Sequence, residues 1–239
     1  MKRSTKNNLQ VLYEDNHLLV VNKRVGDIVQ GDKTGDKPLS EVVKEYIAEK
    51  YQKPGKVFLG VVHRLDRPTT GIVIFARTSK ALERMNKMLR DKEIRKTYWA
   101  LVEGVPAKNK GTLEHHLKKN PKNNKSTAFL KASSDSKKAT LHYKEILRLD
   151  RYSLLEINLE TGRHHQIRTQ LSFIGHPIKG DLKYGSKRSN KDGGIHLHAT
   201  RIEFIHPVKK EKISLEAPRP SESLWKICDS KILQSEVQN

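Results

Sequence analysis

The sequence predicts an α+β fold with a largely antiparallel sheet, and its apolar pattern supports this class in three ways. Short apolar runs bounded by polar residues, such as 18–22 and 72–76, are typical of buried strands. Apolar residues recur at helical spacing in two other stretches, 42–47 and 82–89. The strand-like runs outnumber the helical ones and follow one another directly, which favours an antiparallel sheet over alternating strands and helices.

The expected strands are short and mostly apolar. They cover residues 18–22, 57–62, 72–76, 97–105, 140–149, 152–159, 195–204 and 212–217. The runs 18–22 and 72–76 are bounded by polar residues or by glycine, which end a strand.

The expected helices begin after residues that can cap them. Ser40 precedes the first apolar stripe and is a plausible N-cap. Ser79 opens a second helix, and residues 161–175 are expected to form a turn followed by a third helix. The second helix is expected to bury Leu82, Met85, Met88 and Leu89. The third helix is expected to bury Ile167, Leu171 and Ile174 and to end at Gly175.

Composition and charge restrict the class of protein. The chain has 239 residues, 47 of them Lys or Arg and 27 Asp or Glu, so its formal net charge is +20. Such a charge favours a polyanionic partner, and nucleic acid is preferred to a membrane because no basic amphipathic helix with a broad apolar face is evident. The single cysteine, Cys228, excludes an internal disulfide framework. No secretory signal or membrane span is recognised, so we expect a soluble cytoplasmic protein. A monomer is the default expectation for its oligomeric state.

The expected organisation is one catalytic domain over residues 11–220, between a flexible basic N-terminus (1–10) and a polar tail (221–239) that can carry a final helix. Within that domain, residues 106–138 differ in composition. They contain nine lysines but only Glu114 and Asp135 as acidic residues, so their net charge is +7. This segment is interpreted as a lysine-rich insertion or hairpin that contacts phosphates without reading sequence.

Asp66 is the first candidate for chemistry. It lies in a polar connection between two apolar strands, and Arg64 and Arg67 flank it. Nearby cations favour an ionised carboxylate, which can act as a nucleophile or as an electrostatic stabiliser. The alternative is a loop salt bridge that only fixes a turn.

The segment TGRHHQIR (161–168) is the second candidate, because it places Arg163, His164 and His165 around an expected helix start. A helix N-terminus surrounded by cations suits a phosphate, whereas the alternative is a basic cap with solvated histidines. Tyr98 and Trp99 form the third candidate. Neighbours on a strand point to opposite faces, so one ring can stack on a base while the other enters the core, unless both are packing residues.

Metal and nucleotide sites receive little support. His196 and His198 share a strand face, but the spacing fixes no third ligand, so a structural role is favoured. The sequence contains no GxGxxG motif after a strand, no GxxxxGK[ST] motif and no GxSxG motif.

Together, the segments resemble the pseudouridine synthases of the RluA family over about residues 10–220. The resembling motifs are VLYEDNHLLVVNK (11–23), VVHRLDRPTTGIVIFART (61–78), KTYWALVEG (96–104), TGRHHQIRTQLSFIGHPIKGDLKYG (161–185) and LHATRIEFIHP (197–207). Two positions depart from the usual pattern. Arg24 replaces a proline, and Thr70 replaces a serine while keeping the hydroxyl.

The resemblance implies a fold and a reaction. The fold is the pseudouridine synthase fold, a mixed and mostly antiparallel sheet with a central catalytic cleft flanked by helices and loops. The reaction isomerises uridine to pseudouridine in ribosomal or transfer RNA by base flipping, without cofactor or metal. Many relatives carry an N-terminal RNA-binding domain of the S4 type, which is not expected in this chain.

The resemblance also implies roles for individual residues. Asp66 corresponds to the essential aspartate, Tyr98 to the tyrosine that stacks on the target uracil, and Arg168 to the basic residue that pairs with the aspartate. Arg64 corresponds to an arginine that holds the RNA where the base has been flipped out. The full set of residues expected to bind RNA is His63, Arg64, Arg67, Thr70, Arg163, His165, Gln166, Lys118, Lys119, Lys122 and Lys125.

Two other functions remain open at this level. A non-catalytic RNA-binding or ribosome-assembly protein on the same fold would depend on the lysines and not on Asp66. A DNA glycosylase would release free uracil, which an isomerase does not. The sequence does not decide whether Asp66 attacks C1′, attacks C6 or abstracts a sugar proton.

Overall fold

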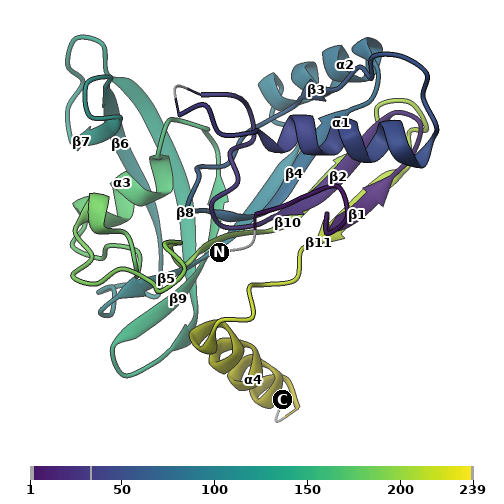
Figure 1. Cartoon of the computed structure of the whole chain (residues 1–239). Helices are drawn as coiled ribbons and strands as arrows, with labels where there is room; N and C mark the ends of the chain where they lie inside the picture. The colour runs from purple at the N-terminus through teal and green to yellow at the C-terminus, as the bar shows by residue number, and fades with distance from the viewer. Residues whose placement is uncertain (1–2, 33, 238–239) are drawn as a thin grey trace. The chain divides into compact units, whose positions relative to one another are not determined.

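A computed structural model describes residues 3–32 and 34–237, and it confirms the α+β class (Figure 1). The helices are α1 (Leu39–Lys50), α2 (Ser79–Arg90), α3 (Gln166–Phe173) and α4 (Ser223–Val237), with a short 3-10 helix η1 (Leu182–Tyr184). The strands are β1 (Val11–Glu14), β2 (Leu18–Lys23), β3 (Gly60–Val61), β4 (Thr70–Ala76), β5 (Arg95–Glu103), β6 (Lys110–Asn120), β7 (Lys125–Phe129), β8 (Lys137–Arg148), β9 (Tyr152–Leu159), β10 (Leu197–Ile205) and β11 (Lys212–Glu216). Among the helices of the described ranges, none has the length and apolar character that crossing a membrane requires.

The chain packs as two compact units, each built from segments that are distant in sequence. The first unit contains residues 1–96 and 199–218, and the second contains residues 97–198 and 219–239. The single catalytic domain expected over 11–220 stays a prediction.

The sheet of the first unit has helices on both faces. Its strands follow the order β1-β2-β4-β10, with β11 paired to β10 and β3 paired to β4. Alternate residues of β2 and β4 face α1 on one side and α2 on the other, so both strands are fully buried. This double coverage explains why both strands are continuous apolar runs in the sequence.

Gly71 is required at the start of β4. Its φ is +111°, and a Cβ atom there would lie 2.3 Å from the carbonyl oxygen of Ala199. Only glycine combines that backbone conformation with so close an approach of β10.

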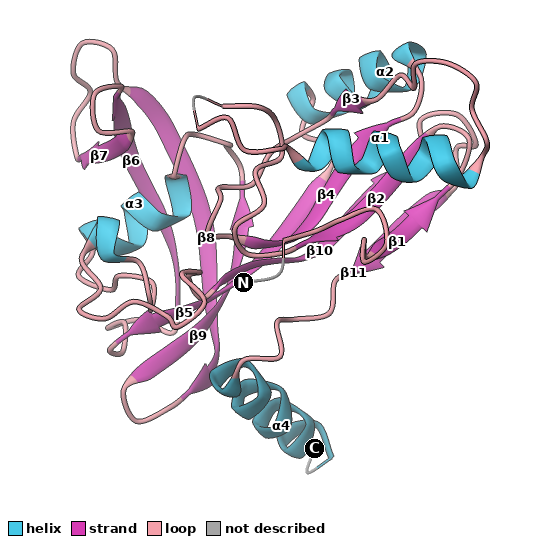
Figure 2. Cartoon of the chain, viewed as in Figure 1, coloured by secondary structure: helices cyan, strands magenta, loops and turns pink. Residues whose placement is uncertain are grey.

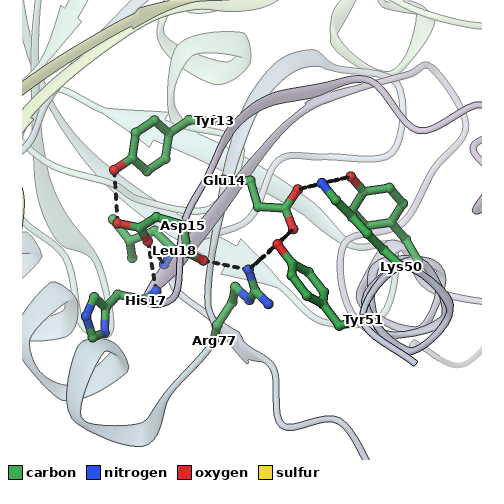
Figure 3. Close-up of polar contacts among 9 residues, drawn as sticks. Tyr13, Glu14, Asp15, His17, Leu18, Lys50, Tyr51 and Arg77 are labelled. Carbon is green, nitrogen blue, oxygen red and sulfur yellow. Dashed lines mark hydrogen bonds and ion pairs between the residues drawn. The ribbon is translucent and has the colours of Figure 1, made fainter. Parts of the chain in front are cut away.

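A carboxylate network joins β1, α1 and the end of β4 in the first unit (Figure 3). Glu14 accepts hydrogen bonds from Lys50 Nζ at 2.7 Å and from the Tyr51 hydroxyl at 2.8 Å, and Arg77 Nη1 lies 3.3 Å away. Burial opposes ionisation of Glu14, but hydrogen bonds from Lys50, Tyr51 and Tyr46 lower its pKa from the ordinary value. The network therefore fixes α1 over the sheet edge through charge-assisted bonds.

The second unit contains an antiparallel sheet in the order β5-β9-β8-β6-β7 (Figure 2). Helix α3 packs against β6 and β7, and α4 places Trp225 and Cys228 in a core cluster with Leu101 and Leu154. The lysine-rich segment contains β6 and β7, which form an antiparallel hairpin. Strand β8 pairs with the other edge of β6, also antiparallel. The backbone hydrogen bonds of the segment are thus satisfied by strand pairing, despite its low apolar content.

Two local expectations differ from the structure. Helix α1 begins at Leu39, because its first N–H groups donate to the carbonyls of Ile28 and Val29, so Ser40 is not the N-cap. Strand 57–62 is reduced to Gly60–Val61, because β4 ends at Ala76, the partner of Gly60.

The N-terminal segment 1–10 was expected to be flexible, and its flexibility stays a prediction. Residues 1–2 lie outside the described ranges. From Arg3 onward the segment is attached to the first unit by polar contacts. Ser4 donates two hydrogen bonds to the buried Asp27, Arg24 Nη2 donates to the carbonyl of Asn8 at 2.9 Å, and Arg3 pairs with Asp36.

Candidate active site

The first unit presents Asp66 on a tight turn before β4. The N–H of Thr69 donates to the carbonyl of Asp66 at 3.0 Å, and the N–H of Gly26 donates to the carbonyl of Arg67 at 3.0 Å. The Asp66 side chain is half-buried. The position of the turn is therefore fixed by backbone hydrogen bonds on both sides of the Asp66 side chain.

The side chain of Lys23, which was not predicted from the sequence as a site residue, binds the backbone of this turn. Its Nζ donates to the carbonyls of Arg24 at 3.0 Å, Arg67 at 3.1 Å and Thr69 at 2.6 Å. The side chain is only 1% exposed. Three acceptors match the three N–H bonds of an ammonium ion. The lysine therefore links the Asp66 turn, through Arg67 and Thr69, to the segment that follows β2 at Arg24.

The charge of Lys23 is balanced by nearby carboxylates. The pKa of Lys23 is about 7, because burial lowers it more than the negative charges of Asp27 and Asp66 raise it. Asp27 is itself held by the backbone N–H of Arg24, at 3.3 Å from Oδ2. A proline at position 24, as the family commonly has, could not donate that hydrogen bond.

His63 joins the chain before Asp66 to β4. Its Nε2 accepts a hydrogen bond from the backbone N–H of Ile74 at 3.3 Å, which requires Nε2 to be unprotonated. Burial, with a smaller effect of Lys96, lowers the pKa of His63 to about 3. The imidazole is thus a neutral structural link, and its predicted contact with RNA stays a prediction.

This neutral imidazole gives a pH dependence of stability. The unfolded chain binds a proton at His63 near its ordinary pKa of about 6.5, whereas the folded chain does so only near 3. The free energy of unfolding is expected to fall as pH decreases from 6.5 toward 3, by up to about 1.4 kcal/mol per pH unit from this group. Denaturant titrations of wild type and His63→Gln between pH 4.5 and 7 would test this. Equal slopes for the two proteins would contradict it.

The other residues expected in the first unit have different environments. Arg67 Nη1 lies 2.6 Å from Asp36 Oδ2, and its Nη2 donates to Thr34 Oγ1 at 2.8 Å. Arg67 therefore binds the side chains of Thr34 and Asp36. Arg64 is exposed, and Thr70 is buried where β4 begins.

In the second unit, Tyr98 and Trp99 occupy adjacent positions of β5. Tyr98 is 6% exposed and is paired with Ile157 of β9. Trp99 packs beside the cluster of Trp225 and Cys228, and the Arg219 guanidinium lies 4.3 Å from the centre of its ring. Since strand neighbours alternate, Tyr98 faces away from that cluster.

The turn before α3 uses its polar groups internally. Gln166 Oε1 accepts from the backbone N–H of Arg163 at 2.9 Å and from Thr161 Oγ1 at 2.8 Å. Arg163 Nε donates to the carbonyl of Lys138 at 3.0 Å. His165 adopts a left-handed conformation with φ of 53° and is 9% exposed. His165 is buried, so this histidine of the turn is not solvated as the cap alternative supposed, and phosphate binding by the turn stays a prediction.

Arg168 forms a buried ion pair in the second unit. Its Nε and Nη2 lie 2.6 and 2.9 Å from the two carboxylate oxygens of Asp181, and the two side chains are 5% and 1% exposed. Such a bidentate pair fixes the plane of the guanidinium. The pairing of Arg168 with Asp66 that the resemblance implies stays a prediction.

Tyr184, also missed in the sequence, connects this arginine to the lysine-rich hairpin. Its hydroxyl accepts the backbone N–H of Ser126 at 2.8 Å and lies 2.8 Å from His165 Nδ1. The Arg168 guanidinium lies 5.0 Å from its ring centre and Lys125 Nζ lies 5.2 Å from it. Burial raises the pKa of Tyr184, so the hydroxyl remains protonated and can donate as well as accept.

The histidines at 196 and 198 have structural partners. His196 Nε2 lies 2.8 Å from Glu222, and its ring is stacked 5.3 Å from Trp225. Across residues 3–32 and 34–237, no group of three or more His, Cys, Asp or Glu side chains is placed to hold a metal ion.

Comparisons with known proteins identify the family. The family model described as RNA pseudouridylate synthase matches residues 17–173. An uncharacterized RNA pseudouridine synthase of Synechocystis is 34% identical over 89% of this chain and 66% of its own length. Ribosomal large subunit pseudouridine synthase D of Zymomonas mobilis is 33% identical over 90% of this chain and 70% of its own length. The human RNA pseudouridylate synthase domain containing 4 is 23% identical, with a TM-score of 0.74 over 89% of each chain.

These matches define the class as enzymes that isomerise uridine in RNA. The chain belongs to the RNA pseudouridylate synthase family, and its fold is the pseudouridine synthase fold. Its family is thus one of isomerases, as the resemblance implied. The chain spans about two thirds of the length of the curated relatives it matches.

Proposed function

We propose that this chain converts specific uridines of ribosomal or transfer RNA to pseudouridine in the cytoplasm, acting as a monomer without cofactor. The observation that carries the proposal is the half-buried Asp66 carboxylate, held on a backbone-bonded turn that Lys23 supports. That turn lies within the segment matched by the family model. The names of two relatives that act on the ribosomal large subunit support ribosomal RNA as the first substrate to test.

The reaction requires one carboxylate and no activated water. The C1′–N1 bond of uridine breaks, the uracil turns, and a C1′–C5 bond forms. C5 releases its hydrogen as a proton and N1 gains a proton, so the product is an isomer of uridine. A glycoside hydrolase needs two carboxylates, one of them as an acid. Asp66 supplies the single carboxylate, by attack on C1′ or C6 or by removal of a sugar proton.

The target base must leave its helical stack before it can react. This costs a few kcal/mol. Stacking on an aromatic ring contributes about 1–3 kcal/mol per base and offsets part of that cost. We assign this stacking role to Tyr98, and the net charge of +20 favours binding of the RNA backbone.

Release of tritium tests the activity directly. RNA labelled with tritium at uracil C5 loses that hydrogen to water when C5 becomes bonded to C1′. Release from ribosomal or transfer RNA, without free uracil, would support the proposal. Binding without release would instead favour the non-catalytic RNA-binding alternative, and free uracil would indicate a glycosylase.

The lysine-rich hairpin leads to a prediction about salt. Lys118, Lys119 and Lys122 are exposed and Lys125 is half-buried. If all four touch phosphates, their replacement by alanine should reduce the slope of log K against log salt by about 0.7 per lost contact. Titrations of RNA at several salt concentrations would measure this. An unchanged slope would place the RNA on another surface.

A further inference from the structure

The sheet formed by β7, β6 and β8 has one covered face and one open face. On the covered face, Leu117, Ala128 and Ala139 form a small cluster with exposures of 5%, 6% and 0%. Helix α3 and η1 pack against the same face. The backbone N–H of Ser126 donates to the Tyr184 hydroxyl of η1, and the ring centres of His115 and Phe173 of α3 lie 4.6 Å apart. This face supplies the packing that the hairpin requires.

The open face carries an aromatic ring that this packing does not require. In the strand register, His116 of β6 lies opposite Phe129 of β7 and opposite Lys138 of β8. Directly opposed residues point to the same face, so these three side chains form one row across the sheet. Phe129 is 38% exposed, and Lys138 is 60% exposed.

The surroundings of this row are mostly cationic and polar. Lys118 lies opposite Thr127 on the same face, two residues along from His116 and Phe129. Its Nζ is 3.7 Å from the exposed Asp135. Lys138 Nζ is 3.2 Å from Glu114, whose side chain is also largely exposed. Ion pairs this exposed contribute little, so the lysines can exchange these partners for phosphates at small cost.

We propose that Phe129, together with His116, Lys118 and Lys138, forms a stacking site for an unpaired nucleotide of the substrate RNA. The proposal rests on the proposed function for the presence of RNA, and it adds a contact outside the candidate active site. An exposed ring on a flat sheet can stack on any base, because every base has a π face. Lysines beside the ring match the phosphates that flank a stacked base, and the net charge of +7 over 106–138 gives the required complementarity.

A purely structural explanation of Phe129 makes a different prediction. A cross-strand pair of Phe129 and His116 would stabilise the hairpin whether or not RNA is present. Removal of the ring would then disturb the positions of the lysines. It would consequently change the salt dependence of RNA binding, whereas loss of a stacking contact alone changes affinity and leaves the number of phosphate contacts the same.

The test measures binding of a fluorescein-labelled 12-nucleotide oligouridine by anisotropy at several salt concentrations. Phe129→Ala is expected to weaken binding about 5- to 150-fold, the range that loss of one stacking contact gives. The slope of log K against log salt is expected to stay as in wild type. Phe129→Tyr keeps a ring and should bind within about twofold of wild type. Leu130→Ala is the matched control, since Leu130 is 75% exposed beside Phe129 and has no ring.

Three results would overturn the proposal: binding by Phe129→Ala within twofold of wild type, an equal loss in Leu130→Ala, or a slope that changes with the ring. Tritium release by the wild-type protein separates this proposal from the proposed function. Loss of affinity in Phe129→Ala with no release by wild type would leave the stacking site standing and remove the isomerase. Normal release by wild type, with unchanged affinity in Phe129→Ala, would support the isomerase and remove the stacking site.

Discussion

Replacing Asp66 with asparagine is expected to reduce tritium release from RNA on the order of 10³-fold or more, because the variant loses the carboxylate that begins the reaction. Asparagine has nearly the same shape as aspartate. The turn is closed by the backbone carbonyl of residue 66, which accepts from the N–H of Thr69, so the substitution leaves that bond in place. RNA affinity is therefore expected to change little. Initial rates of release and anisotropy with the same RNA would measure both quantities.

A matched control is available at the C-terminal end of α2, where Asp91 follows the last helical residue. Asp91→Asn removes a partly exposed carboxylate that pairs with Lys87, and it should keep the wild-type rate within about twofold. An Asp66→Asn protein that keeps more than a tenth of the wild-type rate would contradict the catalytic assignment. Loss of RNA binding in that variant would also contradict it, because the carboxylate would then serve in binding.

Local patterns in the sequence were sufficient for most elements of the fold. Helix α2 begins at Ser79 and buries Met85 and Met88, as the apolar spacing predicts. Strand β9 has the predicted bounds, and β2 extends the predicted run by one residue, to Lys23. These elements are specified by side-chain periodicity within a single segment, which a sequence displays directly.

The contacts that hold the candidate site were not predictable in the same way. The acceptors of Lys23 on the Asp66 turn are 44 and 46 residues away in sequence, and Ser126 is 58 residues from Tyr184. No local period encodes a contact of that range. The sequence does contain one signal for these contacts, which is Lys23 at the end of the buried apolar strand β2. A charged residue in such a place needs polar partners.

The start of α1 shows a related limit. Ser40 has the residue type of an N-cap, but the carbonyls of Ile28 and Val29 already accept the first N–H groups of the helix. A preceding loop that supplies acceptors removes the need for a capping side chain. Cap signals in the sequence therefore identify the region of a helix start more reliably than its first residue.

Replacing Lys23 with methionine is expected to lower the free energy of unfolding by about 2–4 kcal/mol and to reduce the catalytic rate with it. Methionine fills a similar volume but donates no hydrogen bond. The carbonyls of Arg24 and Thr69 would then lose the ammonium donor in a buried site, while the carbonyl of Arg67 would keep the N–H of Gly26. Relief of the buried charge offsets part of this cost, so the loss is smaller than three charged hydrogen bonds would suggest.

The effect should appear in both stability and activity. A change of this size corresponds to a fall in Tm of about 5–15 °C for a chain of this length. The rate at saturating RNA should fall more than the affinity, because Lys23 fixes the Asp66 turn and is too buried to touch RNA. Lys80→Met, which alters an exposed lysine of α2, is the control and should change neither quantity. A Lys23→Met protein with wild-type Tm and rate would show that the backbone bonds of the turn position Asp66 without the lysine.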